Sequence, residues 1–200
     1  MQTSSPTSLQ NSQENQLARV EYKTSIRKRY GEAAQFLSTF APDKMTEYSK
    51  SEERCFKGTA PTLYWVGETY GSEVAESFVE IQISDMFRKV NYSPEKQPTP
   101  EQIEDMAKSI TSTYGSLKVT EFGVFVRLLK SGYFGGIYGG DAITINSYLR
   151  RFMQYRAAKF TQYDAEKTRR DAEEYRQKIK EGKTMNWLEW QEYKKKNNLK

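Results

Sequence analysis

The sequence contains no histidine, and this absence limits the chemistry available to the protein. Nucleophilic catalysis by serine-histidine or cysteine-histidine pairs, acid-base catalysis by imidazole and the common zinc sites all require histidine. The chain also has only one cysteine, Cys55, so it cannot form an internal disulfide. We therefore predict a protein that is not an enzyme and that holds neither a metal nor a cofactor.

Two other groups of residues could carry chemistry, and each has a structural interpretation. Cys55 could act as a nucleophile activated by its cationic neighbours, although a small half-buried hydrophobic residue explains it as well. Glu101, Glu104 and Asp105 could bind a metal or act as a paired acid and base. They lie in the first turn of a predicted helix, however, where the helix dipole stabilises acidic side chains. We favour the structural interpretation in both cases.

Long apolar runs are missing as well. No stretch approaches the roughly 20 apolar residues that cross a bilayer, and the N-terminus lacks the basic and apolar regions of a signal peptide. We therefore expect a cytoplasmic protein with no membrane contact. A content of 36% hydrophobic residues in 200 is enough for one core with extensions.

What the sequence does contain is helical patterning, which predicts an all-α fold. Thr99, Pro100 and Gln102 form a capping box that begins a helix, and Gly115 ends it as a left-handed C-cap. A second helix follows over residues 117–130, with one apolar face. Its polar residues are expected to face water: Lys118, Glu121, Arg127 and Lys130.

The chain divides into three predicted parts. Residues 1–13 are polar and are expected to form a disordered tail. Residues 14–160 form a helical core domain, beginning with a helix that Gly31 interrupts and including a proline-stiffened linker at 92–98. Residues 161–200 form a charged helical arm and a short helix containing tryptophan. The architecture is thus a compact helical bundle with a long protruding C-terminal helix and a short terminal helix.

The glycine-rich segment 132–140 precedes a helix that opens at Asp141. Such a loop could cradle a phosphate, but neither the spacing of a P-loop nor that of a dinucleotide-binding loop occurs. We favour a structural turn, in which Tyr133, Phe134, Ile137 and Tyr138 cover the bundle.

Positive charge is concentrated near the C-terminus. Residues 150–200 hold 15 lysines and arginines against 8 acidic residues, a balance of +7, whereas the first 149 residues have a balance of −2. The helix that opens at Asp141 is the third in the row that begins at Thr99, and we call it the third helix. It carries a basic and aromatic face that could follow a nucleic-acid backbone. Its candidate contact residues are Arg150, Arg151, Tyr155, Arg156 and Lys159. The competing interpretation is that the aromatic residues are core and the arginines pair with neighbouring acids.

The terminal helix begins at a second capping pair, Asn186 and Glu189. It carries Trp187, Trp190 and Tyr193, which could anchor a protein partner or a second copy of the chain, since aromatic anchors dominate many interfaces.

Several motifs in one order resemble a known family. They are CFKGTAPTL at 55–63, YG at 70–71, IQISDM at 81–86, YGSLKVTEF at 114–122, KSGYFGGIYG at 130–139, LRRF at 149–152 and MNWLEW at 185–190. The chain is similar over residues 53–196 to an uncharacterised family of small helical proteins from Bacteroidetes genomes, phages and mobile elements. The resemblance implies a fold and a source but no activity.

These observations favour a non-enzymatic accessory protein in the replication or maintenance of a phage or mobile element, similar to helicase loaders by analogy only. It would contact DNA or a replication protein through the basic helix. The alternative is a structural or protein-interaction subunit, anchored by the helix that contains Trp187 and Trp190.

Overall fold

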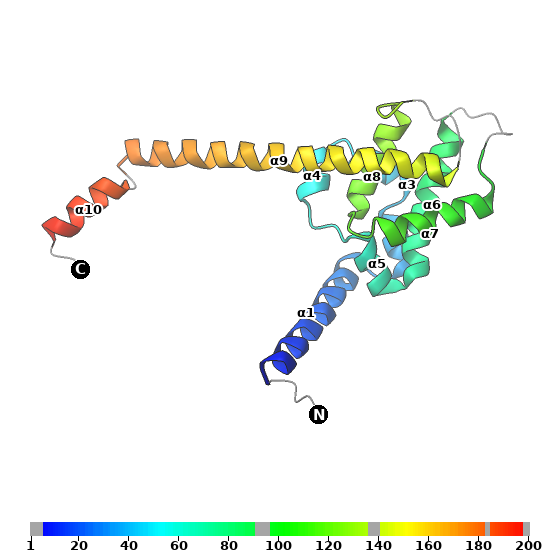
Figure 1. Cartoon of the computed structure of the whole chain (residues 1–200), viewed down its shortest axis with the longest axis horizontal. Coiled ribbons are helices and arrows are strands. Elements are labelled where there is room, and N and C mark those ends of the chain that lie inside the picture. Colours follow the sequence, from blue (N-terminus) through cyan, green and yellow to red (C-terminus); the bar gives the residue numbers. More distant parts are fainter. Residues whose placement is uncertain (1–5, 91–96, 136–140, 183–184, 198–200) are drawn as a thin grey trace. The chain divides into compact units, whose positions relative to one another are not determined.

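The computed structural model describes residues 6–90, 97–135, 141–182 and 185–197. Within these ranges the protein contains ten α-helices and no strand, which confirms the all-α prediction (Figure 1). The helices are α1 (Pro6–Tyr30), α2 (Ala33–Thr39), α3 (Pro42–Tyr48), α4 (Glu52–Lys57), α5 (Leu63–Tyr70), α6 (Ser72–Lys89), α7 (Pro100–Thr113), α8 (Val119–Lys130), α9 (Ala142–Lys180) and α10 (Trp187–Lys196). The predicted long C-terminal helix and short terminal helix are α9 and α10.

The chain divides into two compact units, residues 1–153 and 154–200. The first unit contains α1 to α8 and the first turns of α9, and the second contains the rest of α9 and α10. The boundary lies seven residues before position 160, where the sequence predicts the core domain to end.

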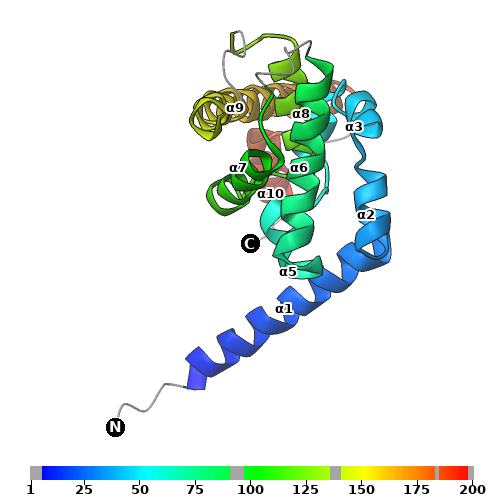
Figure 2. The same ribbon diagram turned by 90° about the vertical axis from the view of Figure 1, so that its right-hand side faces the viewer.

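Helix α8 is the centre of the first unit. It packs against α3, α4 and α6, and α6 in turn packs against α5 and α7 (Figure 2). Phe122 and Phe125 of α8 are buried, with ring centroids 5.6 Å apart. Phe152, from the first turns of α9, adds a third ring 5.6 Å from Phe125. The core is therefore an aromatic cluster around one helix.

The central position of α8 corrects one prediction about its polar residues. Glu121, expected to face water, is fully buried. Its carboxylate accepts a hydrogen bond of 2.9 Å from the backbone N–H of Lys118 and so caps the helix from inside the core. Lys118, Arg127 and Lys130 are half-buried. The prediction was wrong because α8 has neighbours on several sides, whereas an apolar stripe alone implies one covered face.

A backbone connection joins the starts of α5 and α8. Tyr64 donates its N–H to the carbonyl of Gly115 over 2.9 Å, and Leu63 donates to Leu117 over 2.8 Å. Gly115 does not have the left-handed conformation expected of a C-cap, because α7 ends through Tyr114 instead. A Cβ atom added at Gly115 would lie 3.2 Å from the carbonyl oxygen of Thr111, in the last turn of α7, and 3.4 Å from Cβ of Tyr64. The tighter contact is thus with the end of α7 itself, and α5 lies at an ordinary van der Waals distance.

The N-terminal helices follow the predicted break. Gly31 adopts a φ of +75° and separates α1 from α2. The capping box that begins α7 at Thr99 is also confirmed. Residues 6–13, however, belong to α1, although the sequence predicts disorder there. Once a helix has formed, each added residue gains a hydrogen bond at low cost, so a polar segment can extend it. Residues 1–5 lie outside the described residues.

The glycine-rich segment is described only as far as residue 135. Phe134 is buried, and its ring centroid lies 6.4 Å from that of Tyr148, as expected of a turn that covers the bundle. Tyr133, in contrast, is exposed. Gly132 and Gly135 adopt positive φ. Ile137 and Tyr138 lie outside the described residues, as do residues 92–96 of the predicted linker.

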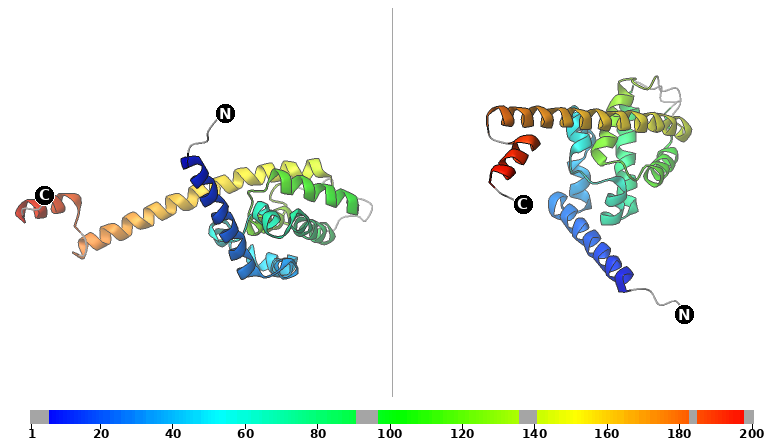
Figure 3. Two further views of the ribbon diagram at one scale, coloured as in Figure 1. Left: turned by 90° about the horizontal axis from the view of Figure 1, so that it is seen from below. Right: turned by 60° about the vertical axis from the view of Figure 1, so that its left-hand side comes forward.

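The second unit is built from two helices. After the end of α9, α10 forms a separate short helix (Figure 3). Its N-cap is Asn186, which exchanges hydrogen bonds of 2.9 Å with Glu189, so the predicted capping pair is confirmed. Because this cap is local in sequence, α10 forms without a buried face of its own.

Candidate nucleic-acid interface

The five basic and aromatic residues predicted on the third helix lie on α9 but fall in different units. Arg150 and Arg151 belong to the first unit and are exposed. The guanidinium of Arg151 donates a hydrogen bond to the carbonyl of Phe134 and lies 5.9 Å from the centroid of its ring. Arg151 therefore helps to hold the glycine-rich turn, while Arg150 is directed to solvent.

The other three candidates, Tyr155, Arg156 and Lys159, belong to the second unit and are half-buried. The guanidinium of Arg156 lies 5.0 Å from the ring centroid of Phe160, and the ammonium of Lys159 lies 5.4 Å from that of Tyr155. Such cation-π contacts hold the charges against the helix. The predicted stripe is thus less available to a ligand than the sequence suggests.

The aromatic residues of α10 are much more accessible. Trp187 is 69% exposed, Trp190 43% and Tyr193 42%. They follow one another at three-residue steps and therefore share one side of the helix. The rings of Trp190 and Tyr193 are stacked, with centroids 5.8 Å apart and an interplanar angle of 18°. The side chains predicted to bind a partner form an exposed aromatic surface, defined here as Trp187, Trp190 and Tyr193.

The second unit also carries exposed cations. Its sequence contains 13 lysines and arginines but only 8 acidic residues. Two cations of the arm pair with acids of α9: Arg169 with Glu173 over 3.9 Å and Lys178 with Glu174 over 2.5 Å. Four others are exposed and have no carboxylate partner within the part of the chain that the structure describes: Lys167, Arg170, Arg176 and Lys180. Charge that is not paired internally remains available to an anion.

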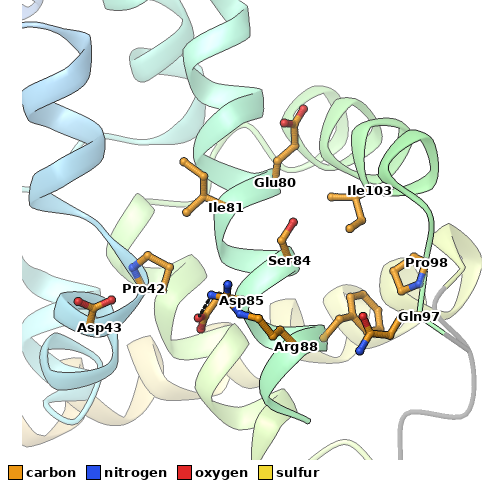
Figure 4. A pocket seen from close by; sticks show the side chains of 11 residues that line it. Pro42, Asp43, Glu80, Ile81, Ser84, Asp85, Arg88, Gln97, Pro98 and Ile103 are labelled. Carbon is orange, nitrogen blue, oxygen red and sulfur yellow. Dashed lines mark hydrogen bonds and ion pairs between the residues drawn. The ribbon is translucent and has the colours of Figure 1, made fainter. Parts of the chain in front are cut away.

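A separate cavity of about 570 Å³ lies in the first unit between the start of α3, α6 and the start of α7 (Figure 4). Its notable residue is Asp85, whose side chain is only 4% exposed. The carboxylate forms ion pairs with Arg88 over 3.1 Å, with Lys89 over 3.0 Å and with Lys130 over 3.0 Å. Asp85 therefore connects the ends of α6 and α8.

The charge of Asp85 is set by two opposing influences. Burial, the largest, disfavours the carboxylate and raises its pKa. The hydrogen bonds from Lys89, Lys130 and Arg88 together have a larger effect than burial, and they hold the pKa of Asp85 below its ordinary value. A carboxylate in this state is a weak base, so the cavity offers an ion-pair network rather than an acid-base group.

The other chemically interesting residues have structural environments. Cys55 is fully buried, and burial raises the pKa of its thiol to about 11, so it is not an activated nucleophile at neutral pH. Glu104 pairs with Lys108 in the next turn of α7. Among the described residues no group of histidine, cysteine, aspartate and glutamate side chains is placed to hold a metal.

The fold and these surfaces define a helical protein with a central aromatic core and an exposed C-terminal aromatic helix. None of the helices in the described ranges is sufficiently long and apolar to cross a membrane. A family model described as "Family of unknown function (DUF6633)" matches residues 96–200, just over half of the chain. The chain therefore belongs to this family, in agreement with the resemblance to an uncharacterised family. Searches of curated proteins and of solved structures found no significant match.

Proposed function

We propose that the protein is a non-enzymatic accessory protein that binds single-stranded nucleic acid through its second unit, residues 154–200. The observation that carries this proposal is the exposure of Trp187, Trp190 and Tyr193 on a short helix, within a unit of net positive charge. Proteins that bind single strands combine aromatic rings, on which bases stack, with cations that contact the phosphates.

The geometry favours a single strand over a duplex. The bases of a duplex are stacked on one another, so an exposed tryptophan cannot reach their faces without unpairing them. In a single strand, every base offers a face to Trp187 or Trp190. Lys194, Lys195 and Lys196 follow in the last turn of α10, where they can contact phosphates on either side of the stacked bases. Stacking of this kind does not read sequence, so we expect binding with little sequence preference.

Salt dependence tests the electrostatic part of the proposal. Anisotropy of a labelled single-stranded oligonucleotide should rise with protein concentration, and the affinity should fall steeply with added salt. If four or five phosphates are neutralised, the logarithm of the binding constant should fall with the logarithm of salt concentration with a slope of about −3. A duplex of the same length should bind more weakly. Absence of binding to either oligonucleotide at low salt would contradict the proposal.

A protein partner is the second candidate, and the shared side of Trp187, Trp190 and Tyr193 on a preformed helix favours it. A helix can insert aromatic anchors at three- and four-residue steps into a groove. The two candidates differ in their response to salt, because burial of aromatic side chains in an apolar groove depends little on ionic strength.

We propose further that this binding serves replication or maintenance of a phage or mobile element in the cytoplasm. The support for this part is the resemblance of the sequence motifs alone. A role similar to that of helicase loaders requires the chain to bind both single-stranded DNA and a replication protein. In that case α10 would contact the DNA, and Arg150 of α9 would be available to the replication protein.

A further inference from the structure

A small pocket in the first unit has an unusual set of charged residues. It lies among the end of α1, α2, α3 and α4 and has a volume of about 160 Å³. Three cationic side chains line it, namely Arg29, Lys44 and Arg54, and we call it the cationic pocket. None of its lining residues, all of which the structure describes, is acidic.

The three cations are held in place by neutral groups. Arg29 donates to the hydroxyl of Thr59, and Lys44 donates to the carbonyl of Ser38 over 2.8 Å. The guanidinium of Arg54 lies 4.5 Å from the ring centroid of Tyr48. Within the described ranges no carboxylate pairs with any of them, so their charges remain uncompensated. Three such charges around one concavity create a strongly positive local potential.

The cationic pocket is also lined by two tyrosines, which can donate hydrogen bonds, and by apolar residues. Tyr30 and Tyr48 are half-buried wall residues, and neither hydroxyl bonds to another described residue. Burial raises the pKa of Tyr30, so its hydroxyl is protonated at neutral pH and can donate a hydrogen bond. Phe40 and Met45 also line the pocket, and both are buried apolar residues.

We propose that the cationic pocket binds the phosphate group of a phosphomonoester. Phosphate oxygens accept several charge-assisted hydrogen bonds at once, and arginine and lysine are the side chains that supply them. The small volume of about 160 Å³ and the buried apolar residues Phe40 and Met45 suit a phosphate at the end of a small carbon skeleton. A polynucleotide backbone, in contrast, has to pass through its site. This site lies in the first unit and does not depend on the proposed role of α10.

Titration calorimetry with inorganic phosphate and phenyl phosphate tests the assignment. The wild-type protein should bind both compounds. Arg29→Gln/Arg54→Gln should weaken phenyl phosphate binding about a hundredfold, since each lost charge-assisted bond accounts for roughly a factor of ten. The charge-matched control Lys28→Gln/Lys50→Gln changes exposed lysines outside the pocket, and its affinity should stay within about twofold of wild type. Lys44→Gln provides a second pocket variant if the double variant does not fold.

Three outcomes would overturn the assignment. The wild-type protein could show no binding of either compound, or the control variant could lose as much affinity as the pocket variant, which would indicate a nonspecific effect of net charge. Alternatively, an oligonucleotide without a terminal phosphate could displace phenyl phosphate, which would identify the ligand as a phosphodiester. Because the test uses small phosphates, its failure would leave binding of single strands by α10 unaffected, and loss of that binding would leave this result unaffected.

Discussion

Replacing Trp187 and Trp190 together with alanine is expected to weaken binding of single-stranded oligonucleotide about a hundredfold or more. Both side chains are exposed on α10, and each base stacked on an aromatic ring contributes roughly 1–3 kcal/mol. Thermal stability should not change, because no residue of α10 is buried. Anisotropy with a labelled oligonucleotide measures the affinity, and a thermal melt followed by circular dichroism measures the stability.

Leu188→Ala is the matched control for this variant. Leu188 is 68% exposed on the same helix, but it has no aromatic face on which a base could stack. Its replacement should change the affinity by less than about threefold. If Leu188→Ala weakened binding as much as the tryptophan changes, general hydrophobic contact or loss of helix would explain the effect, and stacking would be wrong.

Asp85→Asn is expected to lower the free energy of unfolding by about 2–3 kcal/mol, because it leaves Lys130 half-buried without its carboxylate partner. For a chain of this length such a loss corresponds to a fall in melting temperature of roughly 6–10 °C. Asp43→Asn is the control, since Asp43 lines the same cavity but is exposed. Its effect should be within about 0.5 kcal/mol. Urea denaturation of the three proteins measures these differences.

The difference between wild type and Asp85→Asn should depend on pH in one direction. Because the pKa of Asp85 is lower in the folded protein than its ordinary value of 3.8, the folded state favours the carboxylate. Its stabilisation is therefore complete above pH 3.8 and is lost as the pH falls through the folded-state pKa. The two proteins should have converging stabilities in acid. A difference that persists or grows as the pH falls would show that the ion-pair network is not its cause.

Local signals in the sequence predicted much of the fold. The capping boxes at Thr99 and Asn186 and the break at Gly31 were found because a cap or a turn is set by residues a few positions apart. The burial of Glu121 was missed, since it depends on which helices surround α8 rather than on α8 itself. The same limit applies to Gly115, whose surroundings include α5 as well as the end of α7.

The candidate sites show the same division. The exposed aromatic surface was predicted because its three residues lie within one short helix, where spacing alone places them on one side. Asp85 and Lys130 are 45 positions apart, and the three cations of the cationic pocket come from α1, α3 and α4. Periodicity within a helix carries no information on such pairings, which exist only after the helices pack.

The most direct test of the central claim is tryptophan fluorescence during titration with a single-stranded oligothymidylate. If bases stack on Trp187 and Trp190, the fluorescence should fall in a saturable manner, and the remaining signal should come largely from Trp65 of the first unit. In Trp187→Ala/Trp190→Ala the fluorescence of Trp65 should not respond to the oligonucleotide. A wild-type protein whose fluorescence stays constant while anisotropy reports binding would show that the nucleic acid is held elsewhere, and would contradict the role assigned to α10.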